Sequence, residues 1–314
     1  AMLELASRTI GRILFGPAME PAVPQIMRFG YVNDEMMRRT VSPHPLPLWV
    51  PTRANRKLRN GLQAVRSVVD DVISARKAEG DAGVSDDMLG LMLAARDVKG
   101  GGRLTDAEIT DQVLVFLLAG HDTTATTLAC TLAELARRQD WQQQVRDELA
   151  RELGDRRPTA EDLPRLALTG RFVREAMRLY PASHSLGRAP VHDEVLGGYH
   201  LPAGSSVVVY SYALHRSADH WDQPDVFDPG RYDVAEGQAA LRQKQAWMVF
   251  GAGPHSCVGA NLAAVETTVV LATILQHVRL TTDLDSVPVH AEITLKPTGE
   301  LPLGVHRQAV DPVS

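Results

Sequence analysis

The sequence predicts a mainly α-helical fold with a small β region, and three observations support this. Before Pro181, apolar residues recur at every third or fourth position, which is the spacing of one helix face. After Pro181, glycine turns flank apolar, β-branched runs that are typical of short strands. The 314 residues are 44% hydrophobic, which is enough to bury a substantial core.

Net charge and cysteine content exclude several classes of protein. The formal net charge is -5, with Lys and Arg spread among the acidic residues, so we expect no nucleic-acid partner. Cys130 and Cys257 lie far apart in the sequence, which argues against a disulfide scaffold and favours a reducing compartment. The sequence shows neither a secretory leader nor a run of about 18 uncharged apolar residues. We therefore expect a soluble, cytoplasmic chain.

The N-terminal part is expected to form four helices. The first, residues 2–15, ends at Gly16, which tolerates the left-handed conformation of a C-terminal cap. The prolines of SPHPLPLWVP, residues 42–51, remove hydrogen-bond donors and predict a loop. The other three helices are expected at residues 23–39, 53–78 and 85–97, and the second of these is clearly amphipathic.

A long helix of about nine turns is predicted over residues 104–138, because Thr105 and Glu108 have capping-box spacing and the following pattern stays helical. Its middle, AGHDTT, is unfavourable for a helix. Gly120 costs about 1 kcal/mol relative to alanine, and the threonines lose rotamer freedom. Such an irregularity indicates either a functional site or a glycine that lets a neighbouring element approach.

Two more helices are expected at residues 140–153 and 171–180. In the second, Glu175 and Arg178 lie three positions apart and therefore share a helix face. By itself this spacing indicates an ordinary exposed ion pair, so the context of the pair must decide between that and a functional role. Short strands are predicted within residues 195–216. The turn-rich segment WDQPDVFDPGRYD follows, with Arg231 as its basic residue.

Cys257 lies in the glycine-rich stretch FGAGPHSCVG, and an apolar helix is predicted to start within a residue or two of it. The positive end of that helix favours a thiolate, which suits a nucleophile or a metal ligand. A nucleophile needs a base, and a rigid Gly/Pro loop rarely brings His255 to a cysteine two residues away. Zinc would need a second cysteine nearby. A single thiolate suits an iron that a haem macrocycle already holds.

Four motifs together resemble the cytochrome P450 family, the haem-thiolate monooxygenases. FGAGPHSCVG has the family's F-G-x-G-x-H-x-C-x-G haem-binding pattern, and AGHDTT resembles its oxygen-activating motif. EAMR matches its E-x-x-R pair, and FDPGRY matches its downstream arginine motif. All four occur in the family's order and approximate spacing, so a chance match is excluded in practice.

The resemblance implies a role for each residue of the cysteine loop. Cys257 would be the axial ligand of the iron of heme b (iron protoporphyrin IX). Phe250 would pack near the sulfur, and Gly251 would let backbone amides approach it. His255 and Arg188 occupy positions that contact the haem propionates in the family.

The resemblance also implies roles outside the loop. Glu175, Arg178 and Arg231 would form a buried structural network on the cysteine side of the haem. On the opposite side, Gly120 would give dioxygen room, while Asp122 and Thr123 would deliver protons.

The implied activity inserts one oxygen atom into a small apolar organic substrate and reduces the other atom to water. Electrons would come from a separate ferredoxin or flavoprotein reductase, because the sequence has no glycine motif for a flavin or nicotinamide cofactor. Two alternatives stay open: a peroxygenase that uses hydrogen peroxide directly, and a non-catalytic haem-binding fragment. The pairing of Asp122 with Thr123 favours the monooxygenase.

The resemblance treats residues 1–314 as a single P450 domain that is incomplete at its N-terminal side. LELASRTIGRILFG resembles a helix that the family places well inside its fold, after a β-rich region and a haem-contacting helix. We therefore expect exposed apolar surface, self-association and weak haem retention. A membrane anchor in the missing part is the alternative to a cytoplasmic location.

Overall fold

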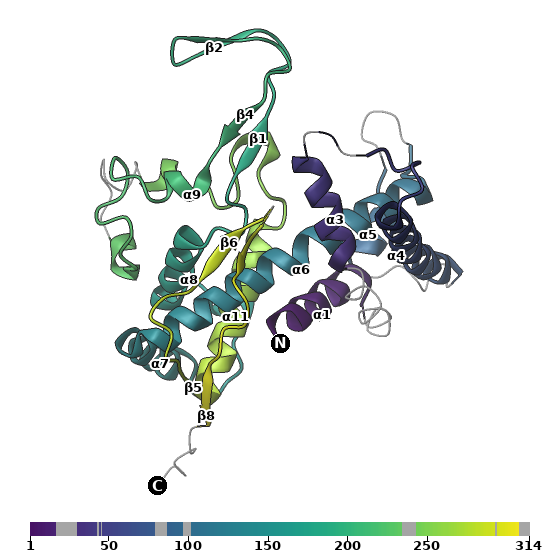
Figure 1. The fold of residues 1–314 in the computed structure, drawn as a ribbon. Coiled ribbons are helices and arrows are strands. Elements are labelled where there is room, and N and C mark those ends of the chain that lie inside the picture. Colours follow the sequence, from purple (N-terminus) through teal and green to yellow (C-terminus); the bar gives the residue numbers. More distant parts are fainter. Residues whose placement is uncertain are drawn as a thin grey trace. The chain divides into compact units, whose positions relative to one another are not determined.

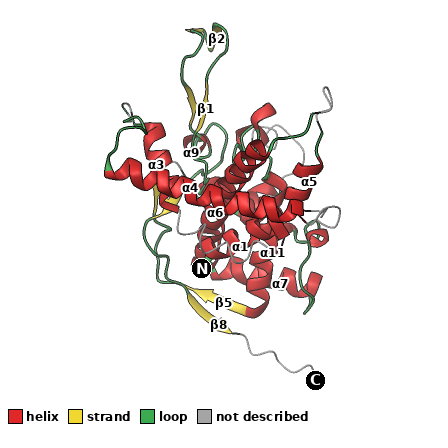
Figure 2. Cartoon of the chain, turned by 90° about the vertical axis from the view of Figure 1, so that its right-hand side faces the viewer, coloured by secondary structure: helices red, strands yellow, loops and turns green. Residues whose placement is uncertain are grey.

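The structure is a computed structural model that describes residues 1–16, 30–42, 44, 46–78, 87–96, 102–233, 243–292 and 294–307. These residues are mainly helical, with short strands, as the sequence predicts (Figures 1 and 2). The chain divides into two compact units, Ala1–Ala125 (unit 1) and Thr126–Ser314 (unit 2). The expectation of a single P450 domain stays a prediction, and each unit is described by itself.

The described part of unit 1 is helical. It contains α1 (Met2–Phe15), α3 (Gly30–Val41), α4 (Arg53–Ala78), α5 (Met88–Ala94) and the first part of α6 (Asp106–Arg137). Helix α1 packs on α5, and α3 packs on α4. The predictions for residues 2–15 and 53–78 are confirmed. Parts of the two other predicted helices, residues 23–29, 85–86 and 97, lie outside the described residues.

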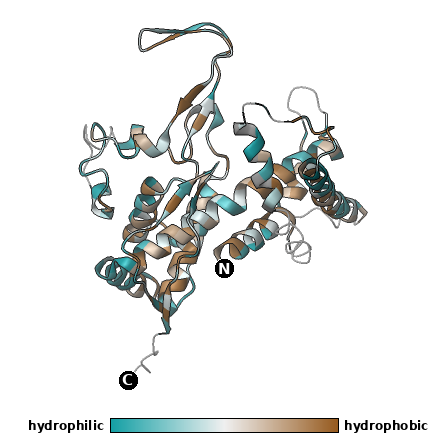
Figure 3. Cartoon of the chain, viewed as in Figure 1, coloured by the Kyte–Doolittle hydropathy of each residue, from teal (hydrophilic) through white to brown (hydrophobic). Residues whose placement is uncertain are grey.

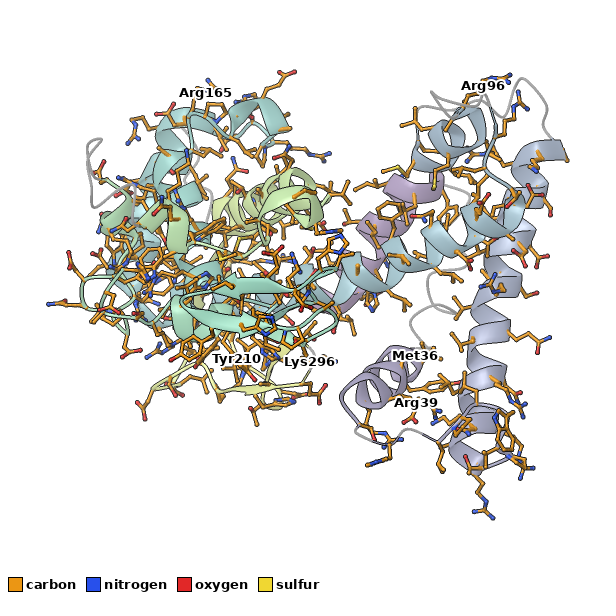
Figure 4. The ribbon with its side chains drawn as sticks, turned by 90° about the horizontal axis from the view of Figure 1, so that it is seen from above. Met36, Arg39, Arg96, Arg165, Tyr210 and Lys296 are labelled. Atoms are coloured by element: carbon orange, nitrogen blue, oxygen red, sulfur yellow. The ribbon has the colours of Figure 1, made fainter. Side chains whose placement is uncertain are left out.

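Three helix ends of unit 1 meet at the Asp87 carboxylate. This side chain caps α5 by accepting a 2.8 Å hydrogen bond from the Gly90 N–H. It also pairs at 2.9 Å with Arg76 near the end of α4, and Arg76 donates to the Phe15 carbonyl at the end of α1. At the other end of α4, Arg39 of α3 donates to the Asn55 side chain (Figure 4). Polar side chains therefore fix both ends of α4.

The long helix α6 begins as its capping box predicts. The Thr105 N–H donates to the Glu108 carboxylate at 2.8 Å, and the Glu108 N–H donates back to the Thr105 hydroxyl at 3.3 Å. By length and composition alone α6 could cross a membrane. Core helices of soluble proteins have the same length and composition, so this property alone is only weak evidence for a membrane-spanning helix.

Unit 2 packs its helices around apolar contacts. Besides the rest of α6, its described residues form α7 (Gln139–Leu153), α8 (Ala167–Leu179), α9 (Ser211–Leu214) and α11 (Ala260–His277), with 3-10 turns at Ala160–Asp162, Pro229–Tyr232 and Gly253–His255. Helices α7, α8 and α11 pack on one another. Apolar residues run along α11 (Figure 3), and Leu271 and Leu275 are completely buried there.

The strands of unit 2 pair as four antiparallel two-stranded sheets, β1–β4, β2–β3, β5–β8 and β6–β7. Their bounds are β1 (Leu186–Arg188), β2 (Glu194–Leu196), β3 (Tyr199–Leu201), β4 (Val207–Val209), β5 (Val278–Thr281), β6 (Val289–Ala291), β7 (Leu295–Pro297) and β8 (Gly304–Arg307). The β prediction for residues 195–216 is right for β2, β3 and β4 and wrong for α9. Strands β1 and β5–β8 were not predicted, because three or four residues are too few to show a clear alternation of apolar and polar residues.

Helix α8 begins at Ala167, four residues before its predicted start, because α7 caps it. The Glu148 carboxylate of α7 accepts hydrogen bonds from the N–H groups of Leu168, at 2.7 Å, and Thr169, at 2.8 Å. The Thr169 hydroxyl donates to the same carboxylate at 2.7 Å. A carboxylate from another helix thus takes the place of a local N-cap residue.

Replacing Glu148 by alanine should lower the free energy of unfolding by about 1–3 kcal/mol, because buried donors of α8 would lose their acceptor. Chemical denaturation would measure this loss. Glu152→Ala is the matched control on the same helix, since Glu152 forms an ion pair with its exposed neighbour Arg151. It should change stability by less than about 0.5 kcal/mol. Equal losses in the two variants would contradict the capping role.

Candidate functional site

Backbone hydrogen bonds close the loop that carries Cys257. The Cys257 N–H donates to the Phe250 carbonyl at 2.8 Å, and the Gly251 N–H donates to the Met248 carbonyl at 3.1 Å. Gly251 and Gly253 both have a φ of +73°, in the left-handed region that favours glycine. The closed loop leaves the Cys257 thiol exposed.

Helix α11 follows this loop, but it begins at Ala260, three residues after the cysteine, rather than within one or two. A turn fills the interval, in which the Ala260 N–H lies 3.4 Å from the Cys257 carbonyl. Cys257 therefore stands just before the amino end of an 18-residue helix. Free N–H groups and the positive end of the helix dipole lie at such an end.

Strand β1, which carries Arg188, lies against the cysteine loop through Leu186. A Cβ atom on Gly251 would lie 3.8 Å from Leu186 Cδ1, so the start of β1 lies against the loop. Leu186 and Arg188 are two residues apart on the strand, so both side chains leave the same face. Arg188 and His255 are exposed, as is Cys257. Unit 2 thus presents a thiol, an imidazole and a guanidinium at its surface.

The Glu175 carboxylate and the two arginines that pair with it are buried, so the alternative of an exposed ion pair is wrong. Arg178 donates from Nε and Nη2 to the two carboxylate oxygens, each at 2.8 Å, and both side chains are 0% exposed. Arg231 Nε donates to Oε1 at 2.9 Å, and the Tyr232 hydroxyl donates to Oε2 at 3.1 Å. Burial and the nearby Glu175 charge raise the pKa of Tyr232 far above its usual value, so this hydroxyl remains a donor.

The remaining donors of the two arginines hold the backbone of residues 215–226. Arg178 Nη1 donates to the carbonyls of His215 and Pro224, each at 2.6 Å. Arg231 donates to the carbonyls of Asp222, at 2.8 Å, and Val226, at 2.9 Å. Because each guanidinium donates to both the carboxylate and the backbone, the network determines the path of this otherwise irregular segment.

Cation–π contacts and an edge-on aromatic pair join the cysteine loop to α8, and no pattern in the sequence predicted them. The guanidinium of Arg174 lies 4.4 Å from the ring centroid of Tyr232 and 5.1 Å from that of Trp247. Trp247 in turn packs edge-on against Phe250, with centroids 5.8 Å apart. Phe250 is therefore held through Trp247 and Arg174. No spacing in the sequence signals this contact, because Arg174 and Trp247 are 73 positions apart.

The AGHDTT motif lies in α6 within unit 1, whereas Cys257 belongs to unit 2. The Thr123 hydroxyl donates to the Ala119 carbonyl one turn earlier, at 2.8 Å. A Cβ atom on Gly120 would lie 2.9 Å from Ile10 of α1, so the glycine lets a neighbouring helix approach. This contact agrees with the second explanation given for Gly120, a glycine that lets a neighbouring element approach. Its role beside dioxygen, like the roles of Asp122 and Thr123, stays a prediction.

Comparison with known proteins covers the part of the chain in which all four motifs lie. The sequence model of the family described as "Cytochrome P450" matches residues 2–300. The chain belongs to the cytochrome P450 family. This P450 is similar to the cyclooctat-9-en-7-ol 5-monooxygenase of Streptomyces melanosporofaciens, with 35% identity over 89% of this chain and 60% of the relative. It is also similar to the pentalenene oxygenase of Streptomyces avermitilis, with 34% identity over 90% of this chain and 62% of the relative.

A solved structure agrees with these comparisons. The crystal structure of the cytochrome P450DA heme domain matches with a TM-score of 0.85 and 30% identity, covering 98% of this chain and 67% of that one. The P450 fold is therefore confirmed. The chain spans about three fifths of the length of the two curated relatives, 60% and 62%.

The residues of unit 2 fit the haem that the P450 family binds. Free cysteines are usually buried, as Cys130 is, but Cys257 is exposed in a loop closed by hydrogen bonds. One sulfur ligand suffices for an iron that a porphyrin already holds. Arg188 and His255 are exposed, and they would offer a positive charge and an imidazole to the acidic edge of such a cofactor. Burial raises the pKa of the Cys130 thiol to about 12, so this second cysteine stays protonated.

Replacing Glu175 by glutamine should cost about 3–5 kcal/mol of folding stability, because two buried arginines would lose their counter-charge. Thermal or chemical denaturation would measure the loss, with solubility as a second readout. Asp233→Asn is the matched control in the same region, because the Asp233 side chain is 77% exposed and pairs with Arg171 at the surface. Its effect should stay within about 1 kcal/mol. A soluble Glu175→Gln variant of unchanged stability would show that the network is dispensable.

Proposed function

We propose that this chain is the haem-thiolate part of a P450 monooxygenase that inserts one atom of dioxygen into an apolar organic substrate. One observation carries the proposal: the exposed Cys257 thiol sits in a closed loop that contacts the buried Glu175 network through Trp247 and Arg174. When bound, heme b supplies the electron-transfer and oxygen chemistry that the side chains lack.

In this proposal the loop residues bind and orient the cofactor. Cys257 would supply the sulfur that holds the iron, and the bond from its N–H to the Phe250 carbonyl fixes the direction of the cysteine backbone. The positive φ of Gly251 keeps the loop backbone turned, where a side chain would cause strain. His255 and Arg188 would hold the propionates, since both are exposed and Arg188 shares a strand face with Leu186, which lies at the loop.

Thr123 and Asp122 are proposed to move protons. Thr123 Oγ1 donates its proton to the Ala119 carbonyl, so toward any further partner this oxygen acts as a hydrogen-bond acceptor. In this proposal the adjacent Asp122 carboxylate takes up a proton from solvent water and, as the acid, passes it through a bridging water to the Thr123 oxygen. Such an acid and alcohol pair supports a monooxygenase over a peroxygenase, which takes its oxygen from a ready-made peroxide.

The substrate and partner proposals rest on the family and on the names of the relatives. P450 monooxygenases act on organic substrates and need an external electron donor, which we propose to be a ferredoxin or a flavoprotein reductase. The relatives are named for pentalenene and for cyclooctat-9-en-7-ol. From these names we propose that the substrate of this chain is also apolar and hydrocarbon-like. The two free thiols support a reducing compartment and hence a cytoplasmic location.

Replacing Cys257 by serine should abolish the strongly red-shifted Soret band of the reduced carbon monoxide complex, because a hydroxyl does not supply the thiolate. Absorption spectra of the haem-loaded chain would show the change. Cys130→Ala is the matched control, since this thiol is 0% exposed and should leave the band in place. A Cys257→Ser variant with the same red-shifted band would rule out Cys257 as the ligand and refute the proposal.

Replacing Thr123 by alanine should leave substrate binding nearly unchanged but lower the product formed per electron by about tenfold or more, as expected for a lost proton-transfer group. Reduced oxygen should appear as hydrogen peroxide, which can be quantified beside the product. Thr131→Ala is the control, because Thr131 is buried on the same helix and makes the same kind of bond to the preceding turn. Unchanged coupling in Thr123→Ala would remove this residue from proton delivery.

A further inference from the structure

His215 is a completely buried histidine that the proposed function does not yet use. It ends the short helix α9, and its ring lies between two backbone groups from other segments. Nδ1 is 3.0 Å from the carbonyl oxygen of Arg178 in α8. Nε2 is 2.9 Å from the backbone nitrogen of Met248, two residues before the FGAGPHSCVG loop. One imidazole thus joins the helix of the Glu175 network to the start of the cysteine loop.

The chemistry of these two partners fixes the tautomer of the ring. The Met248 N–H can only donate, so Nε2 must be unprotonated and accept. The Arg178 carbonyl can only accept, so Nδ1 must carry the proton and donate. A neutral Nδ1–H imidazole satisfies both bonds, whereas the imidazolium ion would place a proton against the Met248 N–H.

The electrostatics around the ring favour the same neutral form. Burial lowers the pKa of His215 to about 4, and the charges of Arg178 and Arg216 act in the same direction. The hydrogen bond to the Arg178 carbonyl and the charge of Glu175 oppose this shift but do not cancel it. At neutral pH the imidazole therefore remains uncharged, as its two hydrogen bonds require.

A continuous set of hydrogen bonds leads from His215 into the loop. Both backbone polar groups of Met248 are hydrogen-bonded. Its N–H donates to His215 Nε2, and its carbonyl accepts from the Gly251 N–H. The next bond closes the loop between the Phe250 carbonyl and the Cys257 N–H. At the other end, Arg178 Nη1 donates to the carbonyl of His215 itself at 2.6 Å. His215 is therefore attached to Arg178 through both its ring and its backbone.

We propose that His215 is a positioning residue for Cys257, which holds the start of the cysteine loop at a fixed position relative to Arg178. The inference rests on the proposed function in one respect, namely that Cys257 ligates the iron. The ring of His215 is fully enclosed and packs edge-on against Trp221, with centroids 6.4 Å apart, so it acts through Met248 and not on a substrate.

Two substitutions separate the hydrogen bonds from the packing. His215→Phe keeps an aromatic ring of similar shape but removes both bonds, leaving the Met248 N–H and the Arg178 carbonyl without the imidazole. His215→Gln places an amide near the Nε2 position, so it can restore the bond to Met248. Glu148→Ala is the control for a general loss of stability, because Glu148 caps α8 and none of its hydrogen bonds reaches the loop.

The first measurement is amide hydrogen exchange of residues 248–257 in the chain without haem. His215→Phe should accelerate exchange in this segment by about tenfold or more relative to the rest of unit 2, and His215→Gln should do so less. Glu148→Ala should show no such local excess. If His215→Phe leaves exchange at Met248, Gly251 and Cys257 unchanged, the proposal is wrong. If the phenylalanine variant does not fold, the test uses His215→Gln, which lacks the bond to the Arg178 carbonyl. Exchange of residues 248–257 should then still be faster than in the wild type, and an unchanged rate would contradict the proposal.

The second measurement is the reduced carbon monoxide spectrum of the haem-loaded variants. We expect the thiolate-ligated fraction to fall in the order wild type, His215→Gln, His215→Phe, while Glu148→Ala keeps the wild-type fraction. Faster exchange with an unchanged thiolate fraction would overturn the positioning role. Failure of the proposed function is distinguishable, because it appears as a retained red-shifted band in Cys257→Ser and does not alter the exchange result.

Discussion

The structure of unit 2 depends on one buried charge, the Glu175 carboxylate. An unpaired carboxylate in the interior would be strongly unfavourable, so the chain must bring donors to both of its oxygens. Arg178 comes from the same helix, but Arg231, Tyr232 and the N–H of Asp228 come from a segment more than 50 positions away. Satisfying this charge therefore determines where the irregular segment of residues 215–233 must run.

The cysteine loop depends on this arrangement. Its own backbone bonds and positive-φ glycines set its internal shape, but they do not determine its position. That position comes from Trp247, which contacts the Arg174 guanidinium, and from His215, which accepts from the Met248 N–H. An exposed thiol has few packing contacts of its own. For Cys257 to serve as a metal ligand, its loop must therefore be held in place by contacts with the rest of unit 2.

Local sequence signals were sufficient for most helices and insufficient for most strands. Helix α6 starts where its capping box predicts, and α1 ends at Gly16, because these signals act within one turn. Helix α8 starts four residues earlier than predicted because its cap, Glu148, lies on another helix. The segment at Ser211–Leu214 reads as a strand from its residues but forms a helix, and its Ser211 hydroxyl bonds to the Ser183 carbonyl. Such partners are distant in sequence and leave no periodic pattern.

For the candidate site, the sequence by itself determined the chemistry: a lone cysteine in a glycine-rich loop, a Glu/Arg pair on one helix face, and an acid beside a threonine. Only the tertiary structure decided that the Glu175–Arg178 pair is buried and that His215 and Trp247 hold the loop. It also showed that Gly120 accommodates Ile10. The reason is physical: residue type and short spacing fix what a side chain can do, whereas burial and long-range contacts arise only when segments far apart in the chain pack together.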